Sequence, residues 1–134
     1  MTPLPVALSA AAACALLNFW LGSRIARYRA DYKVSVGDGG HEPLLRRMRA
    51  QANYIEHAPF FLILLAALEV SGAYALALAL VAAIFVLARI AHGFGMDGGE
   101  LARWRSVGMI SSALATLTLT VWAIACAAEF CLGR

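Results

Sequence analysis

Four long apolar segments, separated by short polar stretches, dominate the hydrophobic pattern of this chain. An α-helix rises about 1.5 Å per residue and a bilayer core is about 30 Å thick, so roughly 20 apolar residues cross it. The pattern therefore predicts an all-α integral membrane four-helix bundle, with residues 1–134 forming one domain. The four predicted spans cover approximately residues 4–23, 49–70, 74–92 and 104–128.

The second predicted span differs from the others because polar residues occupy its first part. Its uncharged apolar part, residues 58–68, covers only about half of a bilayer core before Glu69 ends it. To cross the bilayer, this helix must begin near Arg49, which places Asn53 and Glu56 at membrane depth. Charged groups at that depth are costly and normally face a protein interior or a wet cavity. The segment therefore predicts a polar binding site inside the bundle.

Turn-forming residues separate the predicted spans. Residues 70–73 predict a tight reversal, because one helix over residues 58–88 would be far too long for a bilayer. The glycine-rich residues 93–100 predict a loop, although its first residues can continue the third helix. Pro43 fits the first turn of the helix that enters the membrane as the second span.

The composition agrees with a membrane protein. Hydrophobic residues make up 62% of the chain and charged residues 14%, with a mean hydropathy of +0.74, whereas soluble domains contain about 45–50% apolar and about 25% charged residues. The formal net charge is +3, but no basic face interleaved with aromatic residues is present, which argues against nucleic acid as a partner. The three cysteines lack ligand or disulfide-framework spacing, so no metal site is predicted.

Basic residues predict the orientation of the spans. Ten of the eleven lysine and arginine residues lie in two connections, between the first and second spans and between the third and fourth; only Arg134 lies on the other side. Cytoplasmic connections of membrane proteins carry an excess of basic residues. We therefore expect both connections to lie in the cytoplasm and both termini to lie outside.

Three of the four spans carry polar residues at their cytoplasmic ends. Arg49, Asn53 and Glu56 are spaced by four and three residues, so they share one face of the second helix. The residues at the same depth on the other spans are Arg89 and His92 on the third and Arg105 and Ser106 on the fourth. We expect these groups to converge in the folded bundle.

Two interpretations of this convergence stay open. In the first, the groups satisfy one another, for example through an ion pair between Glu56 and Arg89, while the remaining arginines reach lipid phosphates. In the second, the surplus of arginine over carboxylate binds an anionic partner, which is a lipid phosphate or a ligand with carboxylates.

The residues around this polar stripe resemble a known family. Residues 46–59, RRMRAQANYIEHAP, contain Arg-Ala-x-x-Asn-x-x-Glu-x-x-Pro, which resembles the signature of the MAPEG family, the membrane-associated proteins of eicosanoid and glutathione metabolism. Residues 89–92 and 105–106 look like the two other recurring patches of that family, and residues 36–40 are similar to a loop of its bacterial branch. The resemblance covers essentially the whole chain and implies a homotrimer. In a bacterial inner membrane, the orientation expected from the basic residues makes both termini periplasmic.

The resemblance also implies a glutathione site between neighbouring protomers, open to the cytoplasmic half of the membrane. Its implied glutathione contacts are Arg27, Arg49, Gln51, Asn53, Glu56, His57, Arg89 and His92, with Arg24 as an alternative to Arg27. Arg105 matches the arginine that stabilises the glutathione thiolate, and Ser106 beside it is a candidate hydrogen-bond donor to the thiol. The implied activity is a glutathione transferase or peroxidase acting on hydrophobic electrophiles or lipid hydroperoxides that enter from the bilayer. The alternative is a non-catalytic trimer that binds glutathione or anionic lipid.

The chemistry of glutathione agrees with this site. Glutathione carries two carboxylates and one ammonium group, which an arginine-rich pocket with one glutamate complements. Its thiol has a pKa of about 8.5 and is mostly protonated at neutral pH, and a nearby guanidinium favours the thiolate. Positions that carry tyrosines in animal members are His92, Met96 and Met109 here, which argues against leukotriene- or prostaglandin-type activity.

Overall fold

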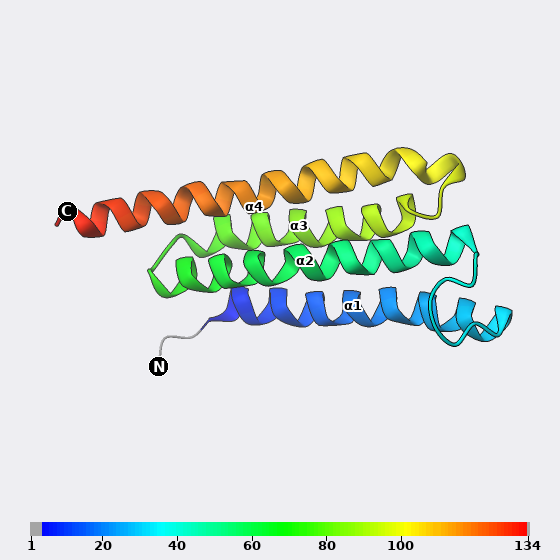
Figure 1. Ribbon diagram of the computed structural model, residues 1–134. Helices are drawn as coiled ribbons and strands as arrows, with labels where there is room; N and C mark the ends of the chain where they lie inside the picture. The colour runs from blue at the N-terminus through cyan, green and yellow to red at the C-terminus, as the bar shows by residue number, and fades with distance from the viewer. Residues whose placement is uncertain (1–3, 134) are drawn as a thin grey trace.

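A computed structural model describes residues 4–133 and consists of four long helices joined by short connections (Figure 1). The helices are α1 (Pro5–Tyr32), α2 (Glu42–Val70), α3 (Ala75–Gly95) and α4 (Ala102–Cys131), and a 3-10 helix, η1 (Gly99–Leu101), directly precedes α4. All four helices are long and apolar enough to cross a membrane, so the predicted all-α class is confirmed. Arg134, counted above on the outer side, lies outside the described residues.

Several helices extend beyond the spans expected from hydrophobicity. Helix α1 continues to Tyr32, and α2 begins at Glu42 with a proline in its first turn, as Pro43 predicts. Helix α3 continues to Gly95, so the first residues of the predicted loop are helical. A helix satisfies its own backbone hydrogen bonds and therefore continues from an apolar segment into a polar one without a penalty.

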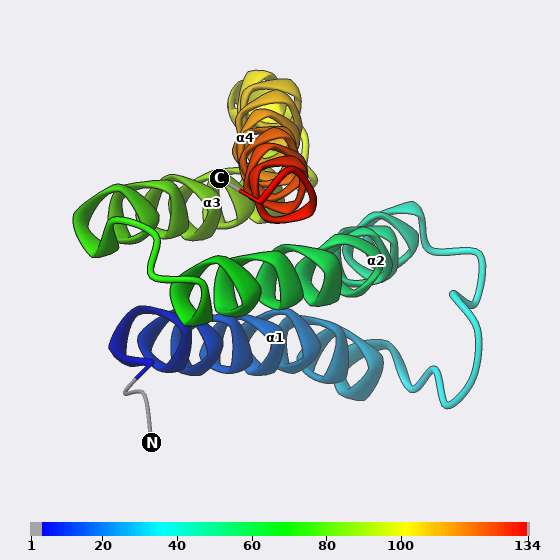
Figure 2. The same cartoon turned by 90° about the vertical axis from the view of Figure 1, so that its left-hand side faces the viewer.

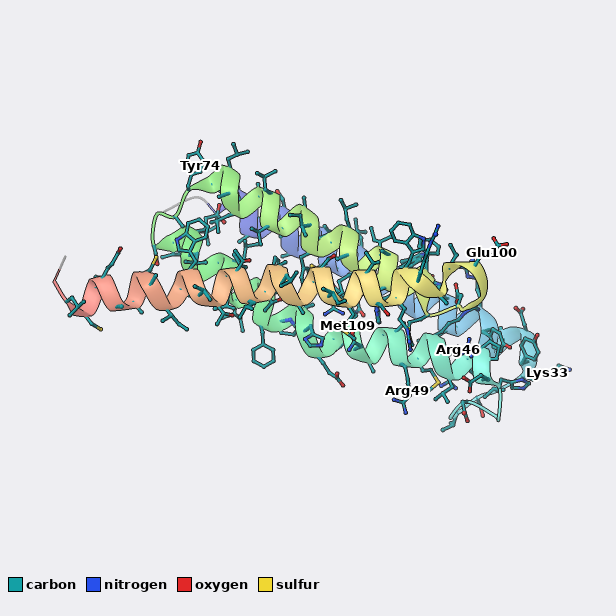
Figure 3. The ribbon with its side chains drawn as sticks, turned by 90° about the horizontal axis from the view of Figure 1, so that it is seen from above. Lys33, Arg46, Arg49, Tyr74, Glu100 and Met109 are labelled. Atoms are coloured by element: carbon teal, nitrogen blue, oxygen red, sulfur yellow. The ribbon has the colours of Figure 1, made fainter. Side chains whose placement is uncertain are left out.

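The chain runs up and down, so both basic connections lie at one end of the molecule and both described ends of the chain at the other (Figure 1). Figure 3 shows Lys33, Arg46, Arg49 and Glu100 at the end with the connections and Tyr74 at the opposite end. Which end faces the cytoplasm stays a prediction. The contact between α3 and α4 is the most extensive of the fold, and α4 lies on the side of α2 and α3 away from α1 (Figure 2).

Apolar side chains from all four helices form one core. Phe61 of α2 and Phe85 of α3 are fully buried and stack with their ring centroids 3.9 Å apart. Cys14 of α1 and Leu119 of α4 belong to the same cluster. All three cysteines are free, and Cys14 acts as a small buried hydrophobic residue.

Glu69, which ends the apolar run of α2, caps the start of α1. Its carboxylate oxygens accept hydrogen bonds from the main-chain N–H groups of Val6 at 2.9 Å and Ala7 at 2.7 Å. The first N–H groups of a helix have no partner inside the helix, and the positive end of the helix dipole favours a carboxylate there. This contact fixes α1 to α2 at the end of the bundle opposite the basic connections.

Two glycines allow α3 and α4 to approach closely at the other end. A Cβ atom placed on Gly95 would lie 2.6 Å from the Cα atom of Arg105, and one placed on Gly108 would lie 2.5 Å from the main-chain nitrogen of His92. No larger residue fits at either position unless the two helices move apart. The glycines thereby place the backbone of Arg105 next to the turn of α3 that carries His92.

Candidate functional site

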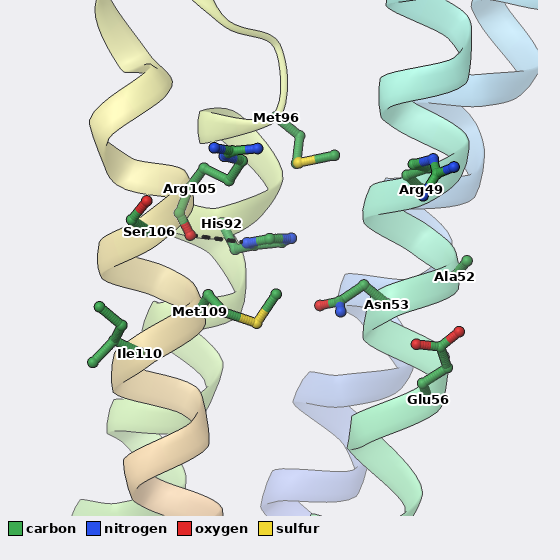
Figure 4. A pocket seen from close by; sticks show the side chains of 10 residues that line it. All are labelled: Arg49, Ala52, Asn53, Glu56, His92, Met96, Arg105, Ser106, Met109 and Ile110. Atoms are coloured by element: carbon green, nitrogen blue, oxygen red, sulfur yellow. Dashed lines mark hydrogen bonds between the residues drawn. The ribbon is translucent and has the colours of Figure 1, made fainter.

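A cavity of about 480 Å³ opens between α2 and the pair formed by α3 and α4 (Figure 4). Its lining contains six of the residues predicted from the sequence and four others. The predicted residues are Arg49, Asn53, Glu56, His92, Arg105 and Ser106, and the others are Ala52, Met96, Met109 and Ile110. Cavities of roughly 300–1,000 Å³ are typical of small-molecule sites, and this one combines guanidinium, carboxylate and amide groups with apolar side chains.

Helix α2 supplies one wall of the cavity because its polar residues follow helical periodicity. Arg49, Ala52, Asn53 and Glu56 lie on one face of the helix. The Asn53 side chain points across the gap toward α3 and α4 (Figure 4), whereas Arg49 and Glu56 are exposed at its edge. This wall therefore presents one positive and one negative charge on either side of a polar amide.

Helices α3 and α4 supply the opposite wall and are held together there by a side chain to main chain hydrogen bond. Nδ1 of His92 lies 3.1 Å from the carbonyl oxygen of Arg105 (Figure 4). The His92 ring and the Met109 side chain point toward α2, while Ser106 and Ile110 lie on the side of α4 turned away from α2. The imidazole of His92 and the thioether of Met109 thus form the centre of this wall, and the Ser106 hydroxyl lies at its rim.

Arg89 lies behind this cavity rather than in its lining. Its Nη1 donates a hydrogen bond of 2.7 Å to Oδ1 of Asn53, and the residue is only 2% exposed. Glu56 makes no ion pair among the described residues. The expected ion pair between Glu56 and Arg89 is therefore wrong, because Arg89 donates to the amide of Asn53 instead and Glu56 is exposed. The polar groups satisfy one another only in part, through the contact between Arg89 and Asn53.

Two buried nitrogen atoms at the site have no hydrogen-bond partner within residues 4–133. They are Nε of Arg89 and Nε2 of His92. Buried polar groups in folded proteins are almost always paired, so unpaired ones call for an explanation in terms of function or bound ligand. Arg89 contacts the lining residue Asn53, and His92 lines the cavity itself. The two unpaired atoms therefore mark this region of the bundle as a candidate binding site.

A second cavity of about 410 Å³ adjoins the first on the side of the basic connections. The two share Arg49, Met96 and Arg105. In the second cavity, Nε of Arg46 lies 3.0 Å from a carboxylate oxygen of Glu42, one helical turn earlier. The first cavity therefore adjoins a polar space on the side of the connections.

Three residues implied by the resemblance lie elsewhere in the protomer. Arg27 of α1 lines a separate cavity of about 370 Å³ on the side of α1. Gln51 of α2 donates to Oδ1 of Asn18 at 3.3 Å, and His57 is exposed outside the cavity lining. A single chain therefore does not bring these residues together with Arg49 and Asn53.

The α1-side cavity contains an ion-pair network that sequence reasoning missed. Asp97, between α3 and η1, forms a salt bridge with Arg24 and lies 3.2 Å from Nε of Arg47. Arg24 is 8% exposed, donates to the carbonyl of Gly93 at 2.8 Å and stacks over Trp20. No local pattern indicated these pairs, because their members are far apart in sequence. The network ties the start of the α3–α4 connection to α1 and α2.

The other lining residues follow helical spacing. Met96 and Met109 were recognised in the sequence only as positions that carry tyrosines in animal members, and Ala52 and Ile110 were missed. Met96 lies four residues after His92, Met109 four residues after Arg105, and Ala52 three residues after Arg49. Residues at these spacings share a helix face. The same periodicity that groups the polar residues would have found the apolar ones.

Comparison with known proteins identifies relatives over most of the chain. The profile of the MAPEG family matches residues 7–125, a range that extends across all four helices. A protein named Inner membrane protein YecN, from Escherichia coli strain K12, is 29% identical to this chain over 107 residues, which cover 80% of this chain and 81% of that protein. A protein of the same name from Escherichia coli O6:H1, strain CFT073, matches over the same shares of both chains.

Proposed function

The chain belongs to the MAPEG family, and from this premise we propose that it is a glutathione-binding protein of the bacterial inner membrane. We propose further that it is a glutathione transferase or peroxidase whose second substrates are hydrophobic electrophiles or lipid hydroperoxides. The motifs of α2 predict the family, and the name of the relatives from Escherichia coli supports the inner membrane.

The observation that carries the proposal is the charge pattern of the cavity. Arg49 offers a guanidinium group and Glu56 a carboxylate, which complement a carboxylate and the ammonium group of glutathione, and Arg105 offers a second guanidinium group that is left for the sulfur. Guanidinium groups bind carboxylates through paired hydrogen bonds. The amide of Asn53 adds donors for a peptide carbonyl, because Arg89 already occupies its oxygen. The residues present therefore fit the tripeptide.

Arg105 is the residue we assign to the thiol. A guanidinium in a partly desolvated site favours the thiolate form of a bound thiol, by roughly 1–3 pKa units in comparable pairs. The adjoining apolar residues Met96, Met109 and Ile110 suit a hydrophobic second substrate that arrives from the bilayer. Ser106 lies at the rim, where its hydroxyl is available to a ligand seated on that side of α4.

The proposed assembly is the homotrimer implied by the family resemblance. Arg27 and Gln51 lie away from the cavity of their own chain, so they can contact the same glutathione only from a neighbouring protomer. A site shared between protomers accounts for both residues. Cytoplasmic basic connections and outside termini remain part of the proposal, because they place the cavity near the cytoplasmic surface, where glutathione is available.

A second candidate function is the binding of an anionic lipid without catalysis. Arg49 and Arg105 are both exposed at the edge of the cavity, and exposed arginines at this depth also suit a lipid phosphate. A phosphate site of this kind tolerates lysine, because it needs positive charge more than a fixed planar guanidinium. Lysine at position 105 should therefore support lipid binding but not the glutathione reaction, which separates the two functions.

The test is a conjugation assay with glutathione and a hydrophobic aryl halide, using purified protein in detergent. We expect Arg105→Ala to bind glutathione within a few-fold of wild type but to lose about 100-fold in kcat, the size typical of a lost charge-stabilising donor. Arg105→Lys should recover little of this loss. Arg103→Ala, which changes an exposed arginine outside the cavity lining, serves as the matched control. Undiminished turnover in Arg105→Ala contradicts the assigned role.

A further inference from the structure

The hydrogen bond between His92 and Arg105 determines which ring nitrogen of His92 carries a hydrogen. A main-chain carbonyl oxygen only accepts hydrogen bonds, so Nδ1, 3.1 Å from the carbonyl of Arg105, must be the donor. In a neutral imidazole the other nitrogen then has no hydrogen and carries a free lone pair. The main chain of α4 therefore presents His92 as an acceptor at Nε2.

The surroundings of His92 favour this neutral ring. Charged and titratable groups surround it on each element packed on the site: Arg49 and Glu56 of α2 line the same cavity, His57 of α2 lies outside it, and Arg89 of α3 and Arg105 of α4 lie close to the ring. Burial of the ring disfavours a charge on it, and the positive charges of Arg89 and Arg105 act in the same direction. An imidazolium would bury a second N–H group and a further positive charge between two guanidinium groups, with no acceptor for it within residues 4–133.

Nε2 is aimed at the place where a ligand would lie. The residue is 3% exposed, and Nε2 is one of the two buried side-chain nitrogens without a partner in the described part of the chain. In Figure 4 the ring points from α3 toward α2, with Met96 on one side and Met109 on the other. Methionine side chains are flexible and rearrange readily, so they can admit a sulfur atom next to Nε2.

We propose that His92 is the general base of this site and removes the proton of the bound thiol through Nε2. The proposal rests on the proposed function, because glutathione supplies the thiol. Nε2 takes the proton, the S–H bond breaks with its electron pair on sulfur, and the ring becomes an imidazolium whose Nδ1–H stays on the carbonyl of Arg105. The guanidinium of Arg105 stabilises the negative sulfur.

The same proton completes the addition reaction. When the sulfur forms a bond to the terminal carbon of an α,β-unsaturated carbonyl compound, the electron pair of the carbon–carbon double bond moves onto the carbon next to the carbonyl group. Nε2 returns its proton to that carbon and regains its lone pair. The product is a thioether, and no oxidant, reductant or metal ion takes part. Arg105 thus contributes twice, through its main chain to the base and through its side chain to the charge.

A direct test is the ¹⁵N NMR spectrum of the histidine rings in detergent-solubilised protein, with His92→Asn used to assign the His92 signals. In the free protein we expect a hydrogen on Nδ1 and none on Nε2. With saturating glutathione we expect hydrogens on both nitrogens. A hydrogen on Nε2 in the free protein overturns the proposal, as does a ring that stays unchanged when glutathione binds.

Calorimetric titration of the same samples separates this proposal from the function on which it rests. An absence of saturable glutathione binding contradicts the proposed function and the base role together. Saturable binding with no change at His92 contradicts the base role alone. The protonation states are read from the wild-type protein, and His92→Asn serves only to assign the signals, so a loss of activity in that variant does not affect the result.

A pair of variants provides the kinetic test. Asparagine at position 92 can still donate to the carbonyl of Arg105 but has no basic nitrogen. We expect His92→Asn to bind glutathione within about threefold of wild type, to lose about 100-fold or more in kcat, and to lose the fall of kcat/KM toward low pH. His41→Asn, at the N-terminal cap of α2 and outside the cavity, should keep the wild-type profile. An unchanged pH profile in His92→Asn overturns the proposal.

Discussion

The guanidinium of Arg89 donates from Nη1 to Oδ1 of Asn53 over 2.7 Å and joins α3 to α2 at the depth of the cavity. Arginine has only donors, so the Asn53 amide must turn its oxygen toward Arg89 and keep its two N–H donors for other partners. Arg89 is 2% exposed, which shields the contact from water. Arg89 therefore orients an amide that lines the cavity, whereas the family resemblance implied direct contact of Arg89 with glutathione.

Replacing Arg89 by methionine tests this role. Arg89→Met keeps most of the side-chain length but leaves the partly buried Oδ1 of Asn53 without its donor, and an unpaired buried polar group costs about 1–3 kcal/mol. We expect a lower thermal midpoint in detergent and at least about 10-fold weaker glutathione binding. Asn53→Asp is the matched variant, because a carboxylate keeps the contact with Arg89 and removes the N–H donors. Asn53→Asp should keep the wild-type thermal midpoint but bind glutathione more weakly. A wild-type midpoint together with wild-type affinity in Arg89→Met would contradict the orienting role of Arg89.

A methyl group on Gly108 should separate α3 from α4 at the site. A Cβ atom there would lie 2.5 Å from the main-chain nitrogen of His92 and 2.8 Å from its Cβ atom. Overpacking of this kind typically costs about 1–3 kcal/mol, so Gly108→Ala should lower the thermal midpoint and weaken the contact between His92 and Arg105. Gly22→Ala is the control, since its nearest neighbour is the flexible end of Gln51 at 3.3 Å. Equal midpoints for the two variants contradict the close approach.

A buried and an exposed ion pair should differ in how much stability is lost when one charge is removed. Asp97 binds Arg24, which is 8% exposed, whereas Glu42 and Arg46 are both largely exposed. Loss of a partner from a buried charge commonly costs several kcal/mol, and exposed pairs contribute about 0–1 kcal/mol. Thermal unfolding should therefore show a clear loss for Asp97→Asn and almost none for Glu42→Gln. The reverse order contradicts the burial of Arg24.

The helices and the polar wall of α2 were predictable from the sequence because both follow local rules. Span length follows from the thickness of a bilayer, and the 3.6-residue period places Arg49, Asn53 and Glu56 on one face. The same period would have added Ala52 to that face. These features depend only on residues a few positions apart, so no knowledge of the packing was needed.

Contacts between helices were not predictable in the same way. Arg24 and Asp97 are 73 residues apart, and the sequence gives no sign that Arg89 binds Asn53 rather than Glu56. The hydrogen bond from His92 to a main-chain carbonyl has no residue-type signal at all, because any residue at position 105 supplies that oxygen. Each of these contacts depends on the rotation and spacing of packed helices. At the site, Gly95 and Gly108 allow the close spacing of α3 and α4.

The most direct measurement is a calorimetric titration of glutathione into the purified protein in detergent, with Glu56→Ala and Glu100→Ala beside wild type. Glu56 lines the cavity, while Glu100 is an exposed carboxylate in η1, outside it. We expect saturable binding to wild type and Glu100→Ala, and binding at least about 10-fold weaker, or about 1.4 kcal/mol, for Glu56→Ala. No saturable binding to folded wild-type protein, or equal binding to all three proteins, would contradict the assignment of this cavity to glutathione.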